Sequence, residues 1–251
     1  MTDPMPQDVN ELSPEDRARF VMDLFHRILM HHGMWFAEAV HQKGMDLALD
    51  ILDRAWRESL SNQAGRLGKT LGFQVADGLP AALVDLPGDK ALALVRALSV
   101  NWLAADGIWF RSMEDACGMN DAKRTNDSCW GRFSPFEAWS VKRFLGLPER
   151  PGLPGLKRAL AFRLYAFVNV WSVTDETPES FTFAMNQCRV QEARKRQGLP
   201  DYPCKSAGLV EYPSFARAVD DRIRTDCVGC PPDPHPGEWY CAWRFTLTET
   251  P

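Results

Sequence analysis

The sequence has no surplus of positive charge and no cluster of lysine and arginine. Its formal net charge is −4 at pH 7, from 29 basic and 33 acidic residues. Proteins that bind nucleic acid or anionic lipid usually carry a basic patch that contacts phosphate groups. We therefore expect neither nucleic acid nor a membrane surface as a partner.

The sequence also lacks the segments that direct a chain into or across a membrane. The first residues show no basic stretch followed by an apolar one, as a secretory signal would. No apolar run approaches the roughly 20 residues that span a bilayer. With 45% hydrophobic and 25% charged residues over 251 positions, the chain is predicted to be a soluble cytoplasmic protein with one large domain or two intimate ones.

No complete catalytic motif is present, so the sequence does not decide whether the protein is an enzyme. What it does contain is an odd number of cysteines, seven, of which five lie at Cys188 or beyond. In a protein that is not secreted, this pattern favours metal ligation or reactive thiols over a disulfide framework. Cys117 and Cys129 fall on predicted helices, where we expect free buried thiols.

The residues from Cys227 to Cys241 form the most informative stretch of the chain. Fifteen residues contain three cysteines, four prolines and two glycines, between two segments that are typical of β-strands. The C-x2-C spacing of Cys227 and Cys230 allows two thiolates to bind one metal ion. With Cys241 and the more distant Cys204 they would complete a four-thiolate site. Two alternative ligands remain open: Cys188 could take the place of Cys204, and His235 the place of Cys241.

Zinc is the metal that this ligand set favours, because four thiolates surround Zn²⁺ as a tetrahedron in structural sites. A [4Fe–4S] cluster is the alternative, since it also takes four cysteines and Cys230-Pro231 matches the end of some ferredoxin motifs. A third interpretation has no metal, with unconnected thiols or a redox pair at Cys227 and Cys230.

The N-terminal part is predicted to be helical and duplicated. A capped helix begins after Ser13, and shorter helices are expected at about 45–60 and 63–71. A shift of 74 positions places Gly33-Met-Trp35-Phe on Gly107-Ile-Trp109-Phe and Gly44-Met on Gly118-Met. The copies span about 20–73 and 94–147. We expect the two units to pack about a pseudo-twofold axis within a helical region 1–147.

The Pro- and Gly-rich segment 148–155 is the predicted boundary to a different kind of structure. An arm at 161–173 and a strand at 181–187 predict one hairpin, and 222–228 with 239–248 predict a second. Helices are expected at 188–197 and 211–219. The fold class is therefore α+β, in which a duplicated helical unit packs with a four-stranded antiparallel sheet in the region 155–251.

A second, weaker set of candidate residues lies on the duplicated helices. His32 and its repeat counterpart Asp106 each precede a glycine, and a pseudo-twofold axis could bring the imidazole and the carboxylate together. Trp35 and Trp109 would then line a small-molecule pocket, although tryptophans at helical spacing more often belong to a core.

Several segments resemble a known group of proteins. Cys188-Arg-Val-Gln-Glu-Ala-Arg, Gly198-Leu-Pro-Asp-Tyr-Pro-Cys204-Lys and the stretch from Cys227 to Pro236 resemble a family of bacterial cytosolic proteins of unknown function. The helix–hairpin tail is more distantly similar to L-2-amino-thiazoline-4-carboxylic acid hydrolase-like proteins and to vinyl-reductase-type ligand-binding domains. The resemblance implies the fold and a reaction class, and no catalytic residue carries over from it.

Two functions follow as expectations. The first is a small-molecule-binding or sensing protein with a structural metal–thiolate site. The second is a hydrolase of a small sulfur- or nitrogen-containing substrate that uses a thiolate or a metal-bound water. The sequence specifies neither the ligand nor the oligomeric state.

Overall fold

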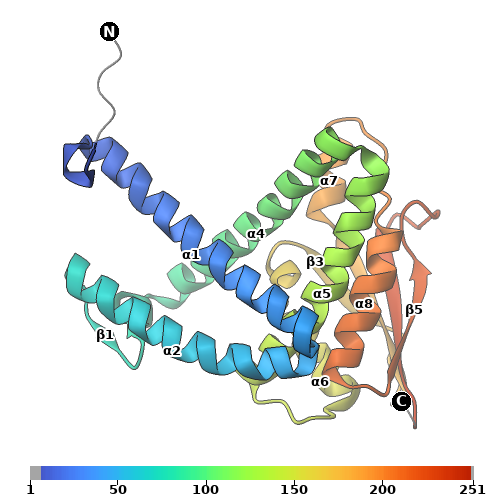
Figure 1. Ribbon diagram of the computed structural model, residues 1–251. Coiled ribbons are helices and arrows are strands. Elements are labelled where there is room, and N and C mark those ends of the chain that lie inside the picture. The colour runs from blue at the N-terminus through green and yellow to red at the C-terminus, as the bar shows by residue number, and fades with distance from the viewer. Residues whose placement is uncertain (1–6, 250–251) are drawn as a thin grey trace. The chain divides into compact units, whose positions relative to one another are not determined.

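A computed structural model describes residues 7–249 of the chain. Residues 1–6, on which the expectation of no secretory signal partly depends, and residues 250–251 lie outside the described part. The chain forms two compact units, of which the first ends at Asp85 and the second begins at Leu86. The elements of both units are labelled in Figure 1.

The first unit is a hairpin of two long helices with a small appendage. Ser13 caps the first helix, because its side-chain oxygen accepts a hydrogen bond from the Asp16 amide at 3.1 Å. The predicted break between residues 60 and 63 is wrong, since one uninterrupted helix covers that stretch and no proline or positive-φ glycine interrupts it. The elements in chain order are η1 (Val9–Glu11), α1 (Pro14–Lys43), α2 (Met45–Leu71), β1 (Val75–Ala76), β2 (Leu79–Pro80) and α3 (Ala81–Val84).

The second unit contains a second long helix pair, a sheet and three shorter helices. Its elements are α4 (Gly88–Cys117), α5 (Met119–Leu145), α6 (Gly152–Ala161), η2 (Leu164–Phe167), β3 (Val170–Thr174), β4 (Ser180–Gln187), α7 (Arg189–Arg196), α8 (Lys205–Val219), β5 (Ile223–Gly229) and β6 (Cys241–Leu247). Two predicted boundaries are wrong. Helix α8 begins at Lys205 rather than at 211. The arm expected at 161–173 begins at the last residue of α6, continues through the turn η2, and forms strand β3 only from Val170.

The two copies of the repeat have the same secondary structure. Adding 74 to each bound of α1 and α2 gives the bounds of α4 and α5. The residues that join the paired helices also agree, because Gly44 has φ 83° and Gly118 has φ 85°, a backbone conformation that glycine adopts without a steric penalty. The repeated element is therefore a hairpin of two long helices, rather than one long and two shorter ones. One copy lies in each unit.

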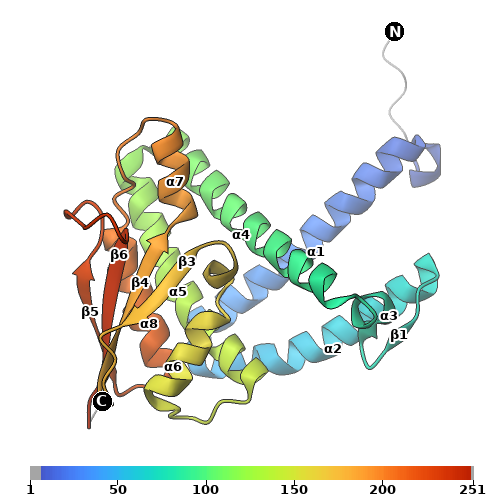
Figure 2. The same cartoon turned by 180° about the vertical axis from the view of Figure 1, so that it is seen from behind.

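The four-stranded sheet confirms the predicted α+β class. The strands are antiparallel in the order β3-β4-β6-β5, which can be followed from behind in Figure 2. Phe183 of β4 lies opposite Trp243 of β6, and Trp243 lies opposite Cys227 of β5. Residues directly opposite each other point to the same face. These three side chains therefore lie on the face of the sheet that helices α6 and α8 cover.

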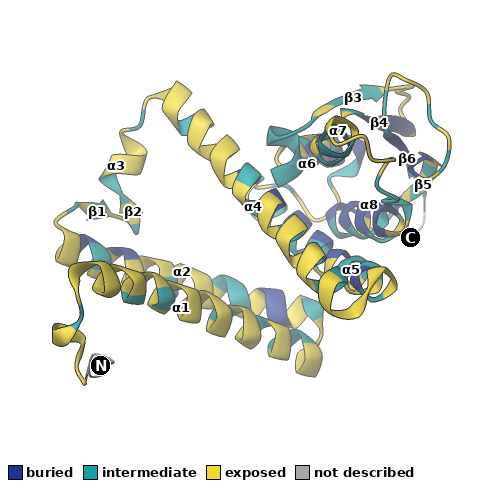
Figure 3. Cartoon of the chain, turned by 90° about the horizontal axis from the view of Figure 1, so that it is seen from above, coloured by how far each residue is buried: buried dark blue, intermediate teal, exposed yellow. Residues whose placement is uncertain are grey.

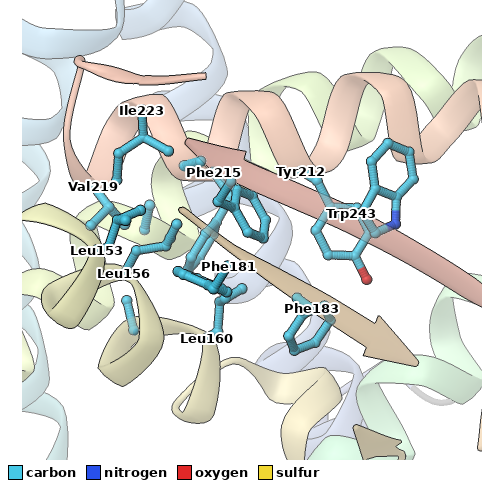
Figure 4. Packing of buried hydrophobic residues seen from close by; sticks show 14 of the residues in the cluster. Leu153, Leu156, Leu160, Phe181, Phe183, Tyr212, Phe215, Val219, Ile223 and Trp243 are labelled. Carbon is cyan, nitrogen blue, oxygen red and sulfur yellow. The ribbon is translucent and has the colours of Figure 1, made fainter. Parts of the chain in front are cut away.

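The core of the second unit lies between this face of the sheet and α6 and α8. Figure 3 shows the buried positions concentrated there, whereas α1 has no buried residue. Figure 4 shows Tyr212 of α8 beside Trp243, and the two rings stack with centroids 4.7 Å apart. Gly208 lies one turn before Tyr212, and a Cβ atom there would be only 2.4 Å from Cζ2 of Trp243. The missing side chain is what lets α8 approach the sheet so closely.

A buried ion cluster joins α5 and α8 to the segment after α6. Arg163 is 2% exposed, and its guanidinium lies 2.7 Å from Glu137 of α5 and 2.8 Å from Glu211 of α8. Its Cζ atom also lies 4.5 Å from the centre of the Phe215 ring. Burial raises the pKa of the Glu211 carboxyl. Burial alone would lower the pKa of Arg163, but the two carboxylates outweigh it and raise that pKa. One cation thus balances two acidic groups inside the protein.

Helix α4 corrects one expectation from the sequence. By length and composition it is apolar enough to cross a membrane, although the sequence was expected to contain no such segment. The expectation concerned uninterrupted apolar runs, and Arg96 and Asp106 interrupt this one. Within the second unit the helix packs on α5 and η2, where the rings of Trp102 and Tyr165 lie 4.8 Å apart.

Candidate metal centre

The structure brings together cysteines that are far apart in the sequence. Cys204 is the N-cap residue of α8, Cys230 follows β5, and Cys241 is the first residue of β6. The Sγ atoms of Cys204 and Cys230 lie 3.5 Å apart, and Cys241 belongs to the same buried cluster. Two residues 26 positions apart and on different elements, Cys204 and Cys230, meet here.

The three thiols differ in their electrostatic environment. The pKa of Cys204 is lowered, first because of its hydrogen bond with Cys230 and further because the Gln191 side-chain amide, a hydrogen-bond donor, lies 3.6 Å from its sulfur. The neighbouring thiols of Cys204 and Cys241, together with burial, raise the pKa of Cys230 far above its ordinary value.

Cys227 lies on the same face of the sheet, next to an unsatisfied buried donor. It is opposite Trp243 in the β5–β6 ladder. Trp243 is fully buried, and its indole nitrogen has no hydrogen-bond partner among residues 7–249. Thr225, two residues before Cys227, also has a buried hydroxyl oxygen without a partner in the described chain. Such groups are costly in a core unless an acceptor is present.

Backbone and side-chain hydrogen bonds hold the cysteine loop against the start of α8. The Lys205 amide donates to the Pro231 carbonyl at 2.9 Å, and the Lys205 Nζ atom lies 2.6 Å from the Asp233 carboxylate. Gln191 of α7 is 1% exposed and exchanges two hydrogen bonds with the backbone of Tyr202. The positions of Cys204 and Cys230 are thus determined by contacts that do not involve sulfur.

The two alternative ligands have other roles in the structure. His235 has both ring nitrogens engaged, Nε2 with Asp201 and Nδ1 with the Pro236 carbonyl, each at 2.9 Å. Cys188 is half-buried before α7, and burial raises its pKa to about 12. Within residues 7–249, no group of three or more His, Cys, Asp or Glu side chains is already spaced to hold a metal ion. A metal would therefore have to draw Cys227 and Cys241 toward the Cys204–Cys230 pair.

The ion pair of His235 gives the cysteine loop a predictable pH dependence. Asp201 raises the pKa of His235 above its ordinary value. A raised folded-state pKa contributes stability that is fully present below the unfolded value of about 6.5 and is lost as the pH rises through the folded value. We expect His235→Gln to lower the urea midpoint at about pH 6 more than at about pH 8.5. An equal loss at both pH values, or the same pattern in the exposed control His41→Gln, would contradict this.

The predicted pocket residues lie in different units. His32 and Trp35 belong to the first unit, where the ring of His32 contacts Trp56 edge to face at 6.0 Å. Asp106 and Trp109 belong to the second, and burial raises the pKa of Asp106. Both Trp35 and Trp109 are largely exposed within their units. The pairing of His32 with Asp106 stays a prediction.

Sequence reasoning missed three features of this region. It gave no role to Gln191, to Trp243 or to the Arg163 ion cluster. Gln191 lies in a short helix rich in charged residues, so only its burial at 1% reveals its role. The expected burial of Cys117 and Cys129 is also wrong, because both lie on exposed helix surface.

The fold and the thiol cluster define an α+β protein in which a duplicated helical hairpin accompanies a four-stranded sheet. A model of a family of unknown function (DUF6125) matches residues 10–87 and 84–247. Together the two matches cover most of the chain, and the chain belongs to this family. No curated protein and no solved structure matches the chain.

Proposed function

We propose that the second unit binds one zinc ion through Cys204, Cys227, Cys230 and Cys241, and that the protein binds or senses a small molecule. The ion would connect the start of α8 to strands β5 and β6. Such a site is closed, because four thiolates leave no position for water. Its role would therefore be to stabilise the C-terminal unit.

The contact between Cys204 and Cys230 carries the proposal. Zinc–sulfur bonds of about 2.3 Å place the sulfurs of a tetrahedral site roughly 3.8 Å apart. The observed 3.5 Å between the two sulfurs is close to this distance without any metal. Cys241 belongs to the same buried cluster as Cys230, and a metal would draw it toward the pair.

The unsatisfied indole of Trp243 supports Cys227 as the fourth ligand. Metal-bound thiolates accept hydrogen bonds from groups around the site, and these donors are part of its design. Trp243 pairs with Cys227 across the β5–β6 ladder, and its buried N–H has no acceptor among the described residues, so that a thiolate on this face of the sheet would supply one. A neutral thiol is a much weaker acceptor.

The proposal also includes the expectations about the compartment, the ligand and the cofactor. All seven cysteines are free in the described chain, which suits a reducing cytoplasm. The ligand would be a small molecule, with neither nucleic acid nor a membrane as partner. A [4Fe–4S] cluster is the alternative cofactor. The alternative function is a hydrolase, which requires an open position on the metal or a free thiolate.

Elemental analysis of the full chain, purified without oxygen, tests the proposal. We expect about one zinc per chain. Serine variants at Cys204, Cys227, Cys230 and Cys241 should each lose most of the metal and part of the thermal stability, whereas Cys117→Ser and Cys129→Ser should lose neither. Retention of full metal by Cys204→Ser would overturn the ligand set. Detection of iron and sulfide instead of zinc would identify the cofactor as an iron–sulfur cluster.

A further inference from the structure

The direct contact between two of the clustered thiols also permits a chemistry other than metal binding. Cys204 and Cys230 are in direct contact at 3.5 Å, whereas Cys227, the nearer cysteine in sequence, forms no such contact in the described structure. Only Cys204 of this pair is partly exposed, and Cys230 is 1% exposed. Residue Cys204 is thus partly exposed, and its Sγ atom is in contact with that of the buried Cys230.

We infer that Cys204 and Cys230 form a reversible disulfide when the reduced protein meets a peroxide. This pair differs from the Cys227–Cys230 pair that the C-x2-C spacing indicates. A disulfide bond is about 2.05 Å long, so the sulfurs must approach by roughly 1.5 Å. Cys204 borders a loop and Cys230 lies within one, so neither sulfur is fixed inside a helix or strand.

The oxidation divides into two balanced steps. The Cys204 sulfur attacks one peroxide oxygen, the O–O bond breaks, and water leaves with the thiol proton, which gives a sulfenic acid. The Cys230 sulfur then attacks the Cys204 sulfur, the S–O bond breaks, and a second water leaves with the Cys230 proton. Two thiols lose two electrons, and one hydrogen peroxide becomes two waters. A dithiol reductant reverses the result.

The same chemistry would control the metal, a consequence that rests on the proposed function. A disulfide sulfur is no longer a thiolate, and the thiolate is the form that binds metal. Oxidation of Cys204 and Cys230 would remove two of the four ligands together. The oxidation state of Cys204 and Cys230 would then determine whether the protein binds metal: the reduced protein would, and the oxidised protein would not.

Disulfide mapping in the metal-free full-length protein tests the inference directly. The reduced protein is treated with a small excess of hydrogen peroxide, remaining thiols are alkylated, and peptides are identified by mass spectrometry. We expect a peptide pair linked through Cys204 and Cys230 to account for most of both cysteines, and dithiothreitol to remove it. Links through Cys227 or Cys241 in its place, or no link, would overturn the inference.

Variants and metal release separate this inference from the zinc proposal. Cys117→Ser/Cys129→Ser removes the exposed thiols and should still form the link, whereas Cys204→Ser should leave Cys230 reduced. In metal-loaded protein, zinc release should rise in parallel with the Cys204–Cys230 link. A Cys204–Cys230 disulfide in protein that never carries metal would support the disulfide inference and contradict the zinc site. Release of zinc on oxidation without this disulfide would support the zinc site and contradict the disulfide inference.

Discussion

Replacement of Arg163 by methionine is expected to destabilise the protein by about 3–5 kcal/mol, because it leaves two carboxyl groups without a cation in the interior. Glu137 and Glu211 lie 2.7 and 2.8 Å from the guanidinium and are themselves buried. Glu137 also accepts a hydrogen bond from the Leu164 amide. Urea unfolding followed by circular dichroism measures the change in the free energy of unfolding.

A matched variant separates the buried charge from the loss of an arginine. Arg19 lies in an exposed ion pair with Glu15 on α1, and its side chain is 69% exposed. Arg19→Met should cost less than about 1 kcal/mol. Substitution of all three buried partners, Arg163→Met with Glu137→Leu and Glu211→Leu, should recover much of the loss. Equal costs for Arg163→Met and Arg19→Met would show that the cluster is not buried as described.

Gly208→Ala is expected to cost about 1–3 kcal/mol, because the new methyl group overlaps a ring that has no room to move. The added Cβ would lie 2.4 Å from Cζ2 of Trp243, which is fully buried between α8 and the sheet. The variant must therefore push α8 away from β6. Thermal unfolding reports the change.

Gly107 provides the control for this substitution. It also lies inside a long helix, α4, but a Cβ atom there meets no other atom within 4 Å. Gly107→Ala should therefore stabilise the protein by about 0.5–1 kcal/mol, the usual gain when alanine replaces glycine in a helix. Stabilisation by Gly208→Ala as well would contradict the close approach of α8 to Trp243.

The sequence could predict the fold where its patterns are local or repeated. The duplication follows from paired residues such as Gly44 and Gly118, whose positive φ angles mark the same turn twice. The end of α8 was predicted correctly but its start was placed too late, because Gly208 near the start looks like an interruption. Tertiary packing on Trp243 and α5 overrides these local signals.

The candidate site was predictable in its residue types and less so in its arrangement. Spacing predicted that Cys204 would approach the C-x2-C pair, and the structure places it against Cys230. It could not predict that Cys204 touches this cysteine alone, or that the buried Gln191 donates to its sulfur. Those contacts depend on how α7, α8 and the loop after β5 meet in space, which residue spacing does not encode.

The central claim is that four sulfurs surround one metal ion in the second unit. X-ray absorption at the zinc edge of the full-length protein, purified without oxygen, counts and identifies the neighbouring atoms. We predict four sulfurs at about 2.3 Å and no nitrogen or oxygen neighbour. Three sulfurs with one oxygen would favour the hydrolase, and zinc surrounded by nitrogen and oxygen alone would contradict the account.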